Sequence, residues 1–372
     1  VRLASACFML ATLVILLLTF RLLGIRTPWL PVLIFACSPV VIHIARINFG
    51  HSPSLFLIAL GTYLVLRARA RQQVWLAIPA GMAIGLSAYG YPGFYVATPV
   101  FIGTILLGDL YAVRFDAYRA RHTIVATVAA LACLMPIAHE ALTNPGFASR
   151  FSAKDTASYG LISGARAESV LQNYPKYFGL DYLFATGETG LPGALITRHS
   201  VSGAGLLAWV SLPLLVVGIL GLVFHRCRER RRPFLPFLLL AALFPLPDVL
   251  TTSTSDPPYT FAVATGVLLV PYVAAYGLEV LATHREQRRH EATRTTPDPF
   301  GAIWTGLTAV RTITLVTVVL AAIFVFGTYA RYPLVSSGFW GWQAGPRHMI
   351  GYYLAHQDNY DAFVMEGRFN EP

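Results

Sequence analysis

The chain has 372 residues, of which 55% are hydrophobic and only 12% are charged, and its mean hydropathy is +0.58. A soluble domain carries about 25% charged residues, and disordered chains combine low hydrophobicity with high charge, so the composition excludes both classes. Four cysteines are also too few for a disulfide-stapled fold of this length. The net charge of +10, from 26 Arg and 2 Lys against 18 acidic residues, would suggest a nucleic-acid partner in a soluble protein.

Apolar stretches of about 20 residues recur along the chain, and each is long enough to cross a hydrocarbon core of about 30 Å. They predict an all-α, polytopic membrane protein. The second and third of them also fit a tilted or partly interfacial hairpin. In chain order we expect ten transmembrane helices near residues 3–23, 28–44, 52–66, 74–90, 92–108, 122–141, 205–225, 233–250, 258–281 and 311–330.

Two domains follow from the spacing of these helices. Residues 1–330 are expected to form the transmembrane domain, with a long outer loop at 142–204. This domain includes a polar cytoplasmic linker at 282–310, rich in Arg, His, Thr and Pro, which we expect to be flexible and to lie on anionic headgroups. Residues 331–372 are expected to form an outer C-terminal extension that is incomplete, with an amphipathic helix near 345–356.

The charge distribution predicts the orientation of the chain. Ten crossings place both termini on the same side, so alternate loops can be compared by charge. One set of loops holds 18 basic and 7 acidic residues, a net +11, whereas the other set, with the termini, holds 10 and 11, a net −1. Because basic loops stay cytoplasmic, both termini are predicted on the outer side of a plasma (inner) membrane. Topology thus accounts for the basic excess, and no nucleic-acid partner is expected.

The polar residues of the predicted helices gather at their outer ends. None of the middle thirds carries Asp, Glu, Lys or Arg, whereas pumps and ion-coupled transporters usually bury ionisable groups there. Short outer links instead carry RINFGHSP (46–53), YGYPG (89–93) and TTSTSDPP (251–258). We find no nucleotide- or metal-binding motif, so no cofactor and no metal site are evident. This pattern indicates a site at the outer interface, where a lipid substrate and an aqueous acceptor can meet.

Five segments also carry a family resemblance. They are RLASACFMLATLVILLLTFRLLG (2–24), SPVVIHIARINFG (38–50), GMAIGLSAYGYPGFYVATPVF (81–101), KYFGLDYLFATGETGLPGALITRHSVSGAGLL (176–207) and DPPYTFAVATGVLLVPYVAAYGLEVL (256–281). In this order they resemble the GT-C glycosyltransferases, specifically the protein O-mannosyltransferase-like group. The resemblance implies a GT-C-like fold and protein glycosylation. A hexosyl group, such as mannosyl, would pass from a polyprenyl-phosphate sugar donor to a protein or glycan acceptor at the outer face.

The resemblance also implies site residues. Arg46 occupies the family's Arg position, and the planar guanidinium matches the oxygens of a departing lipid phosphate; the alternative is an arginine that snorkels to the interface. His43 lies one helical turn earlier on the same face and equally suits a hydrogen-bonded structural histidine. Tyr89 and Tyr91 would bind phosphate or stack on the sugar, or else anchor the chain in the aromatic belt.

The remaining implied residues lie in outer loops. Arg198 and His199 occupy the family's Arg-His position, near phosphate or acceptor, or form a solvated pair. Asp256 contacts substrate or caps the helix that begins at Pro257. The family's catalytic carboxylate, an Asp in an outer loop after its first span, has no counterpart here. It is expected to lie before Val1, in an N-terminally truncated member.

Two other functions fit the same sequence. A passive transporter or flippase for lipid-linked saccharides is one, because the lack of mid-span charges argues only against ion coupling. A non-catalytic pseudoenzyme subunit is the other. The identity of the sugar and of the acceptor, the need for a divalent metal and the oligomeric state stay open.

Overall fold

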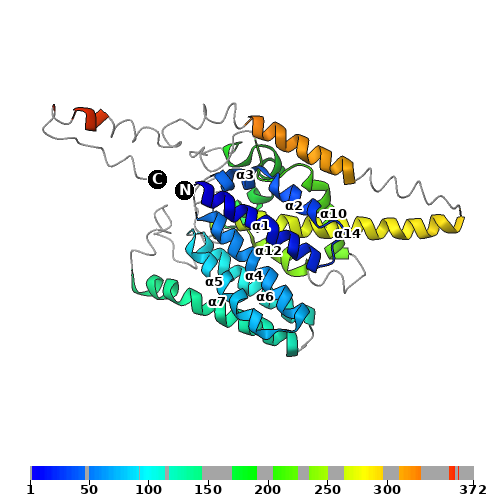
Figure 1. Cartoon of the computed structure of the whole chain (residues 1–372), viewed down its shortest axis with the longest axis horizontal. Coiled ribbons are helices and arrows are strands. Elements are labelled where there is room, and N and C mark those ends of the chain that lie inside the picture. Colours follow the sequence, from blue (N-terminus) through cyan, green and yellow to red (C-terminus); the bar gives the residue numbers. More distant parts are fainter. Residues whose placement is uncertain are drawn as a thin grey trace.

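The structure is a computed structural model, and every regular element in its described part is a helix. The first half of the chain folds into a helical bundle (Figure 1). The structure describes residues 2–46, 50–91, 93–113, 117–144, 170–190, 204–224, 234–249, 264–295, 310–327, 352–356 and 359. The helices of the first half are α1 (Arg2–Leu22), α2 (Trp29–Ala36), α3 (Pro39–Arg46), α4 (His51–Arg71), η1 (Val74–Leu76), α5 (Ala77–Leu86), η2 (Ser87–Tyr89), α6 (Phe94–Val113) and α7 (Ala117–Thr143).

The second half packs against this bundle through α14, which contacts α2 and α4, and through α12 and α13, which contact α6. A further helix, Val310–Gly327, lies at its periphery (Figure 1). The other elements of this half are η4 (Tyr174–Phe178), η5 (Asp181–Ala185), η6 (Gly187–Gly190), α10 (Ser211–Phe224), α12 (Leu235–Leu243), α13 (Leu246–Val249) and α14 (Ala264–Thr295).

The helices of the described part suit an integral membrane protein. Five of them are long and apolar enough to cross a membrane: Leu3–Leu22, His51–Arg71, Ala120–Thr143, Ala264–His284 and Val310–Gly327. The pair α2 and α3, bent by 66°, adds a sixth crossing if it is one span. Four shorter apolar helices are Val74–Tyr89, Phe94–Leu107, Ser211–Phe224 and Leu235–Val249. The all-α class is therefore confirmed for the described part and is compatible with a membrane protein, whereas the number of crossings stays a prediction.

Two predicted spans differ from the observed helices. The stretch 28–44 is broken between Ala36 and Pro39, because proline lacks an N–H and disfavours helical geometry in the residue before it. The stretch 205–225 becomes helical only at Ser211. Its first residues run in irregular conformation, and the Leu207 N–H donates to the Leu183 carbonyl oxygen at 2.8 Å. Tertiary hydrogen bonds thus replace the first turn of the predicted helix.

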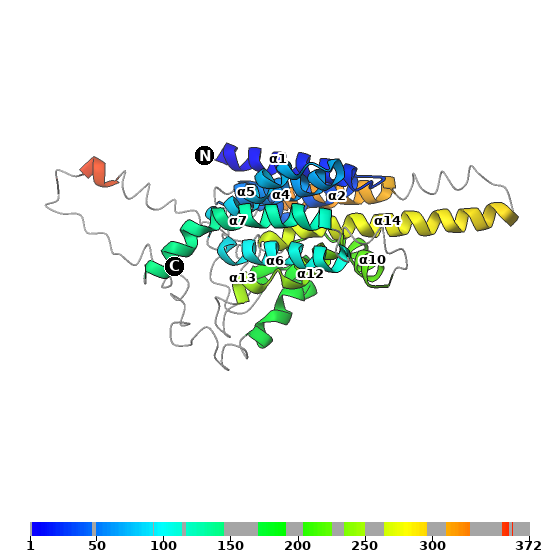
Figure 2. The same cartoon turned by 90° about the horizontal axis from the view of Figure 1, so that it is seen from below.

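The predicted flexible linker at 282–310 is wrong over its first half. Helix α14 continues to Thr295, well beyond the apolar part of its sequence (Figures 1 and 2). Arg, Glu and Gln dominate this extension, and all three have high helix propensity. Residues 296–309 lie outside the described part, as does all of the predicted extension 331–372 except 352–356 and 359.

Small residues allow the helices of the first half to approach closely. Gly81 and Gly85 of α5 face Ala126 and Ala130 of α7. A Cβ atom on Gly81 would lie 2.0 Å from the Ala126 carbonyl oxygen, and one on Gly85 would lie 2.5 Å from that of Ala130. Small residues at every fourth position are typical of packing between membrane helices. In lipid the hydrophobic effect does not drive helices together, and van der Waals contact between closely approaching backbones takes its place.

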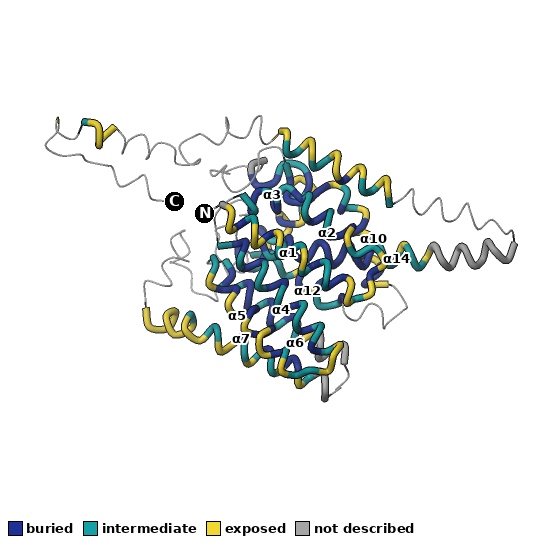
Figure 3. The backbone as a smooth tube through the Cα atoms, in the orientation of Figure 1, coloured by how far each residue is buried: buried dark blue, intermediate teal, exposed yellow. Residues whose placement is uncertain are grey.

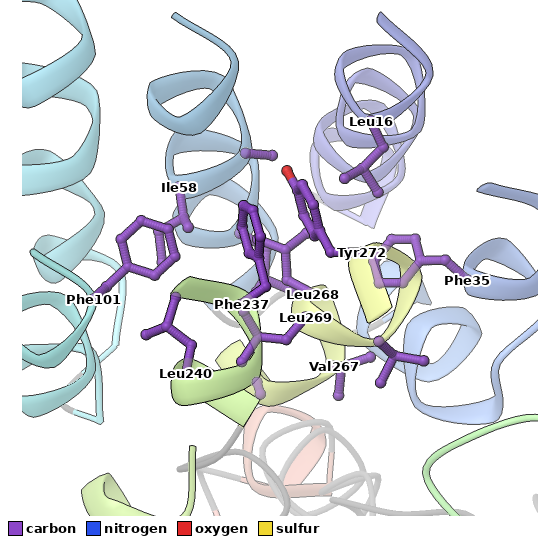
Figure 4. Close-up of a cluster of buried hydrophobic side chains, with 14 of the residues drawn as sticks. Leu16, Phe35, Ile58, Phe101, Phe237, Leu240, Val267, Leu268, Leu269 and Tyr272 are labelled. Carbon is purple, nitrogen blue, oxygen red and sulfur yellow. The ribbon is translucent and has the colours of Figure 1, made fainter. Parts of the chain in front are cut away.

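Aromatic side chains join the two halves at the centre (Figure 4). Tyr272 of α14 stacks on Phe237 of α12, with ring centroids 3.9 Å apart and planes at 9°. Its edge meets Phe20 of α1 at 5.2 Å. Burial is deepest here, whereas α7 and Val310–Gly327 present exposed outer faces (Figure 3). These outer faces are apolar, as expected for surfaces in contact with lipid.

Candidate functional site

The bundle has two ends of different character. Helices α1 and α4 begin and α7 terminates at one end, on the left of Figures 1 and 2. We call it the His51 end, since α4 begins at His51. The opposite end, from which α14 projects, is called the Arg26 end. There the Arg26 backbone N–H donates to Glu279 Oε1 at 2.8 Å, and the two side chains form an ion pair at 3.7 Å.

A contact between two glycine backbones organises the His51 end. A Cβ atom on Gly50 would lie 1.7 Å from the Gly90 carbonyl oxygen, and one on Gly90 would lie 2.2 Å from the Gly50 carbonyl oxygen. No side chain fits at either position. Two links that are 40 residues apart in the sequence, around Gly50 and around Gly90, therefore touch each other. The sequence identified both links as outer polar turns but did not indicate that they meet.

The contact brings His51 against Tyr91. The two rings lie 4.1 Å apart between centroids, and Phe94 meets the same imidazole at 6.0 Å. His51 and the predicted His43 are both buried, so both histidines belong to the interior of the His51 end. The Ser52 hydroxyl lies 3.4 Å from the Ile44 carbonyl oxygen, which ties the start of α4 to the last turn of α3.

A chain of buried hydroxyl groups supports the glycine contact. Ser54 Oγ donates to the Ser87 carbonyl oxygen at 2.7 Å, and Ser87 Oγ lies 2.6 Å from the Ile84 carbonyl oxygen and 2.9 Å from Thr98 Oγ1. These groups come from α4, from the α5 and η2 region, and from α6. Buried polar groups are stable only when they are hydrogen-bonded. These hydrogen bonds therefore fix the positions of the three elements relative to one another. Sequence analysis missed these hydroxyls, because isolated Ser and Thr residues in apolar helices carry no distinctive signal.

The other predicted residues of this end divide into two groups. Arg46 is the last residue of α3 and is partly exposed at the His51 end. Tyr91 packs on His51, as described. Tyr89, in contrast, is half exposed and donates its hydroxyl to the Cys133 carbonyl oxygen of α7 at 2.8 Å. The structure thus brings Tyr91 to the histidine and directs Tyr89 to a neighbouring helix.

A second polar contact joins the segment 170–190, part of the loop predicted at 142–204, to α13. The Tyr177 hydroxyl donates to Asp248 Oδ2 at 2.5 Å, and both side chains are buried. Tyr174 donates to the Ala242 carbonyl oxygen, and burial raises the pKa of its phenol above the ordinary value, which keeps it protonated as a donor. Asp248 could have been singled out in the sequence as the carboxylate at the end of a predicted span.

Some site predictions have no structural test. Arg198, His199 and Asp256 lie outside the described residues. Within the described part, no three His, Cys, Asp or Glu side chains lie close enough together to hold a metal ion. A void of about 20 Å³ between α4, α6, α12 and α14 has apolar walls and has room for about one water molecule. It is therefore too small to be the binding site of a lipid or a sugar.

The chain matches no model of a known protein family, no curated protein and no solved structure. The fold therefore defines its class as a helical integral membrane protein, with a buried polar cluster at one end.

Proposed function

We propose that this protein is a membrane glycosyltransferase that uses a polyprenyl-phosphate sugar as donor and a hydroxyl group of a protein or glycan as acceptor. The observation that supports the proposal most is the contact between Gly50 and Gly90. It gathers the Arg46 turn, the two buried histidines and Tyr91 at one end of the bundle. The guanidinium of Arg46 would be the cation that binds a lipid phosphate, and the polar cluster beside it would be the site of the sugar.

The proposed topology has ten crossings, with the His51 end outside a plasma (inner) membrane. Each predicted span overlaps an apolar helix: five long ones, one bent pair and four shorter ones. A 15-residue helix is about 22 Å long, so the shorter helices need local thinning of the bilayer or flanking non-helical residues to complete a crossing. The described side chains Arg67, Arg69 and Arg121, near the helix termini of the Arg26 end, fit the cytoplasmic side.

In the proposed reaction, the bond between the anomeric carbon of the sugar and the phosphate oxygen breaks. The acceptor oxygen forms the new glycosidic bond and loses its proton, and the polyprenyl phosphate leaves with the additional negative charge. Arg46 stabilises that charge, because its N–H groups match two phosphate oxygens at once. His51 holds Tyr91 in position through their ring contact, and Tyr91 lines the sugar side of the site. Arg198, His199 and Asp256 are proposed to approach from the outer loops.

The direct test is sugar transfer from a radiolabelled polyprenyl-phosphate hexose, measured in membranes that contain the chain or its variants. Arg46→Ala is expected to lower transfer by about 100-fold, the scale of losing one charge-stabilising donor. Arg46→Lys keeps the charge but not the fork and is expected to recover only part of the activity. Arg121→Ala, an exposed arginine at the Arg26 end, is the matched control and should leave transfer unchanged.

Full transfer by Arg46→Ala would refute the proposed role of this residue. Movement of the labelled lipid across the membrane without transfer would favour a flippase. Absence of both activities in folded protein would favour a non-catalytic subunit.

A further inference from the structure

The described part of the outer loop, residues 170–190, lies along the side of α12 and α13. Tyr174 reaches the Ala242 carbonyl oxygen, and Tyr177 reaches the Asp248 carboxylate. These two anchor points are six residues apart, about 9 Å at the rise of an α-helix. The segment therefore runs beside the last turns of the α12–α13 stretch instead of standing above them.

This position is at the His51 end of the molecule. Pro247 of α13 and Ala97, in the first turn of α6, line the same small void, whereas deeper in the bundle Leu240 lines it together with Phe101. Helix α6 begins at Phe94, which contacts His51. The segment is thus level with the ends of the apolar helices, where the boundary of a membrane falls.

The segment has two distinct sides. Its inward side chains, which face the bundle, are buried: Asn173, Tyr177, Tyr182 and Phe184. Its outward side chains include three large apolar residues that are exposed, namely Leu171 at 74%, Phe178 at 41% and Leu180 at 56%. Lys176 and Asp181, close to these apolar residues in the sequence, are also exposed. Large apolar side chains that a protein leaves exposed together with charged neighbours mark an interaction surface.

Two exposed side chains flank the segment. Trp209, 48% exposed, packs on Phe184 of η5 with ring centroids 5.3 Å apart. Leu239 of α12, one turn before Ala242, is also exposed. Tryptophan is enriched at the level of the lipid headgroups, because its ring is apolar and its N–H needs a polar partner. The outward side of the segment therefore adjoins the apolar surface of a helix that suits a membrane.

We propose that Leu171, Phe178, Leu180 and Trp209 form a membrane-interface anchor that inserts into the boundary between headgroups and acyl chains at the His51 end. Lys176 and Asp181 extend from it into the headgroup layer. There a lysine can keep its methylene stem against apolar groups and its ammonium group in water. The tyrosine contacts to Ala242 and Asp248 fix the anchor to the transmembrane body. This binding of the bilayer surface does not depend on the proposed transferase activity.

A spin-label and thiol-labelling experiment on the full-length chain tests the proposal. Cys7, Cys37, Cys133 and Cys227 are replaced by Ser, and single cysteines are introduced by Leu171→Cys, Phe178→Cys, Leu180→Cys, Lys176→Cys and Asp181→Cys. Val128→Cys, on the exposed apolar face of α7, is the lipid-facing reference. Each variant is reconstituted in phosphatidylcholine vesicles and reacted with a membrane-impermeant maleimide. In parallel, its nitroxide derivative is tested for collisions with oxygen and with a water-soluble nickel chelate.

Cysteines at 171, 178 and 180 are expected to react about tenfold more slowly than those at 176 and 181. In each variant the remaining apolar side chains hold the segment in the membrane, and each of them favours an apolar medium by at least about that factor. Their nitroxides should collide mainly with oxygen, at a shallower depth than Val128→Cys. Rapid labelling and strong collisions with the nickel chelate at 178 and 180 would overturn the proposal. Protection from both oxygen and nickel would also overturn it, because that result indicates a protein partner on this surface.

Discussion

The two ends of the helix bundle contain polar groups in different ways. At the His51 end, uncharged side chains are buried in a chain of hydrogen bonds around two touching backbones. At the Arg26 end, the polar contacts are made by charged side chains, with an ion pair between Arg26 and Glu279 at 3.7 Å and a hydrogen bond from Arg69 to Thr123 at 2.9 Å. A surface ion pair contributes about 0–1 kcal/mol, whereas an unmet buried hydrogen bond costs about 1–3 kcal/mol. The buried hydrogen bonds therefore make the geometry of the His51 end more costly to change, and this is the end at which we propose the substrate site.

Substitution of Gly50 should have the largest effect of any change discussed here. Gly50→Ala places a Cβ atom against the Gly90 carbonyl oxygen, with a starting separation of 1.7 Å, so the two links must separate. We expect a loss of about 3 kcal/mol or more in the free energy of unfolding, measured by thermal unfolding of the purified protein in detergent.

Gly103→Ala in α6 is the control for this substitution, because nothing lies within 4 Å of the added Cβ atom. It should leave stability unchanged or raise it by about 0.5–1 kcal/mol through helix propensity. Equal effects of the two substitutions would show that the glycine contact does not hold the two links together.

The buried pair of Tyr177 and Asp248 should give the next largest effect. Asp248→Ala removes the acceptor and leaves the Tyr177 hydroxyl buried without it, at a cost of about 1–3 kcal/mol. Asp248→Asn keeps an acceptor oxygen and should lose less. Asp181→Ala, at an exposed position, should change stability by less than about 0.5 kcal/mol. Thermal unfolding of the three variants gives the ranking, and an equal loss in Asp181→Ala would contradict it.

The hydroxyl chain at the His51 end should show an intermediate effect. Ser87→Ala removes the contacts to the Ile84 carbonyl oxygen and to Thr98 Oγ1, and we expect a loss of about 1–2 kcal/mol. Thr314→Ala is the control. Among the contacts described, the Thr314 hydroxyl bonds only to the Val310 carbonyl oxygen of its own peripheral helix. This substitution should lower the free energy of unfolding by a few tenths of a kcal/mol. Equal midpoints of thermal unfolding for the two variants would mean that the buried hydroxyl groups are not structurally important.

The smallest effect is expected at the Arg26 end. Glu279→Gln removes the charge but keeps an oxygen that can accept the Arg26 backbone N–H. The loss should stay below about 1 kcal/mol and should shrink further at high salt, which screens the exposed pair. A loss larger than that of Ser87→Ala, or one that is independent of salt, would remove the contrast between the two ends.

Sequence periodicity identified the helices well where a span is long and uninterrupted. The predictions near 52–66 and 122–141 overlap α4 and α7, because hydropathy depends only on local composition. The break between α2 and α3 was missed, although Pro39 is a local signal for it. The helical extension of α14 was missed because its polar residues resemble a linker when only apolar content is considered.

The candidate site was only partly predictable. Arg46 and His43 were identified because both lie at the end of an apolar stretch. The contact between Gly50 and Gly90 joins links 40 residues apart, and no local pattern encodes such a pairing. For the same reason the sequence could not distinguish Tyr91, which packs on His51, from Tyr89, which bonds to α7.

The most direct test of the central claim is to map where a polyprenyl-phosphate analogue binds. A photoreactive analogue with its reactive group next to the phosphate is irradiated with the reconstituted protein, and the labelled peptides are identified by mass spectrometry. The account predicts labelling within residues 43–54 and 89–98, reduced by Arg46→Ala and by an excess of unlabelled polyprenyl phosphate. Labelling concentrated at the Arg26 end, or labelling that unmodified lipid does not reduce, would contradict it.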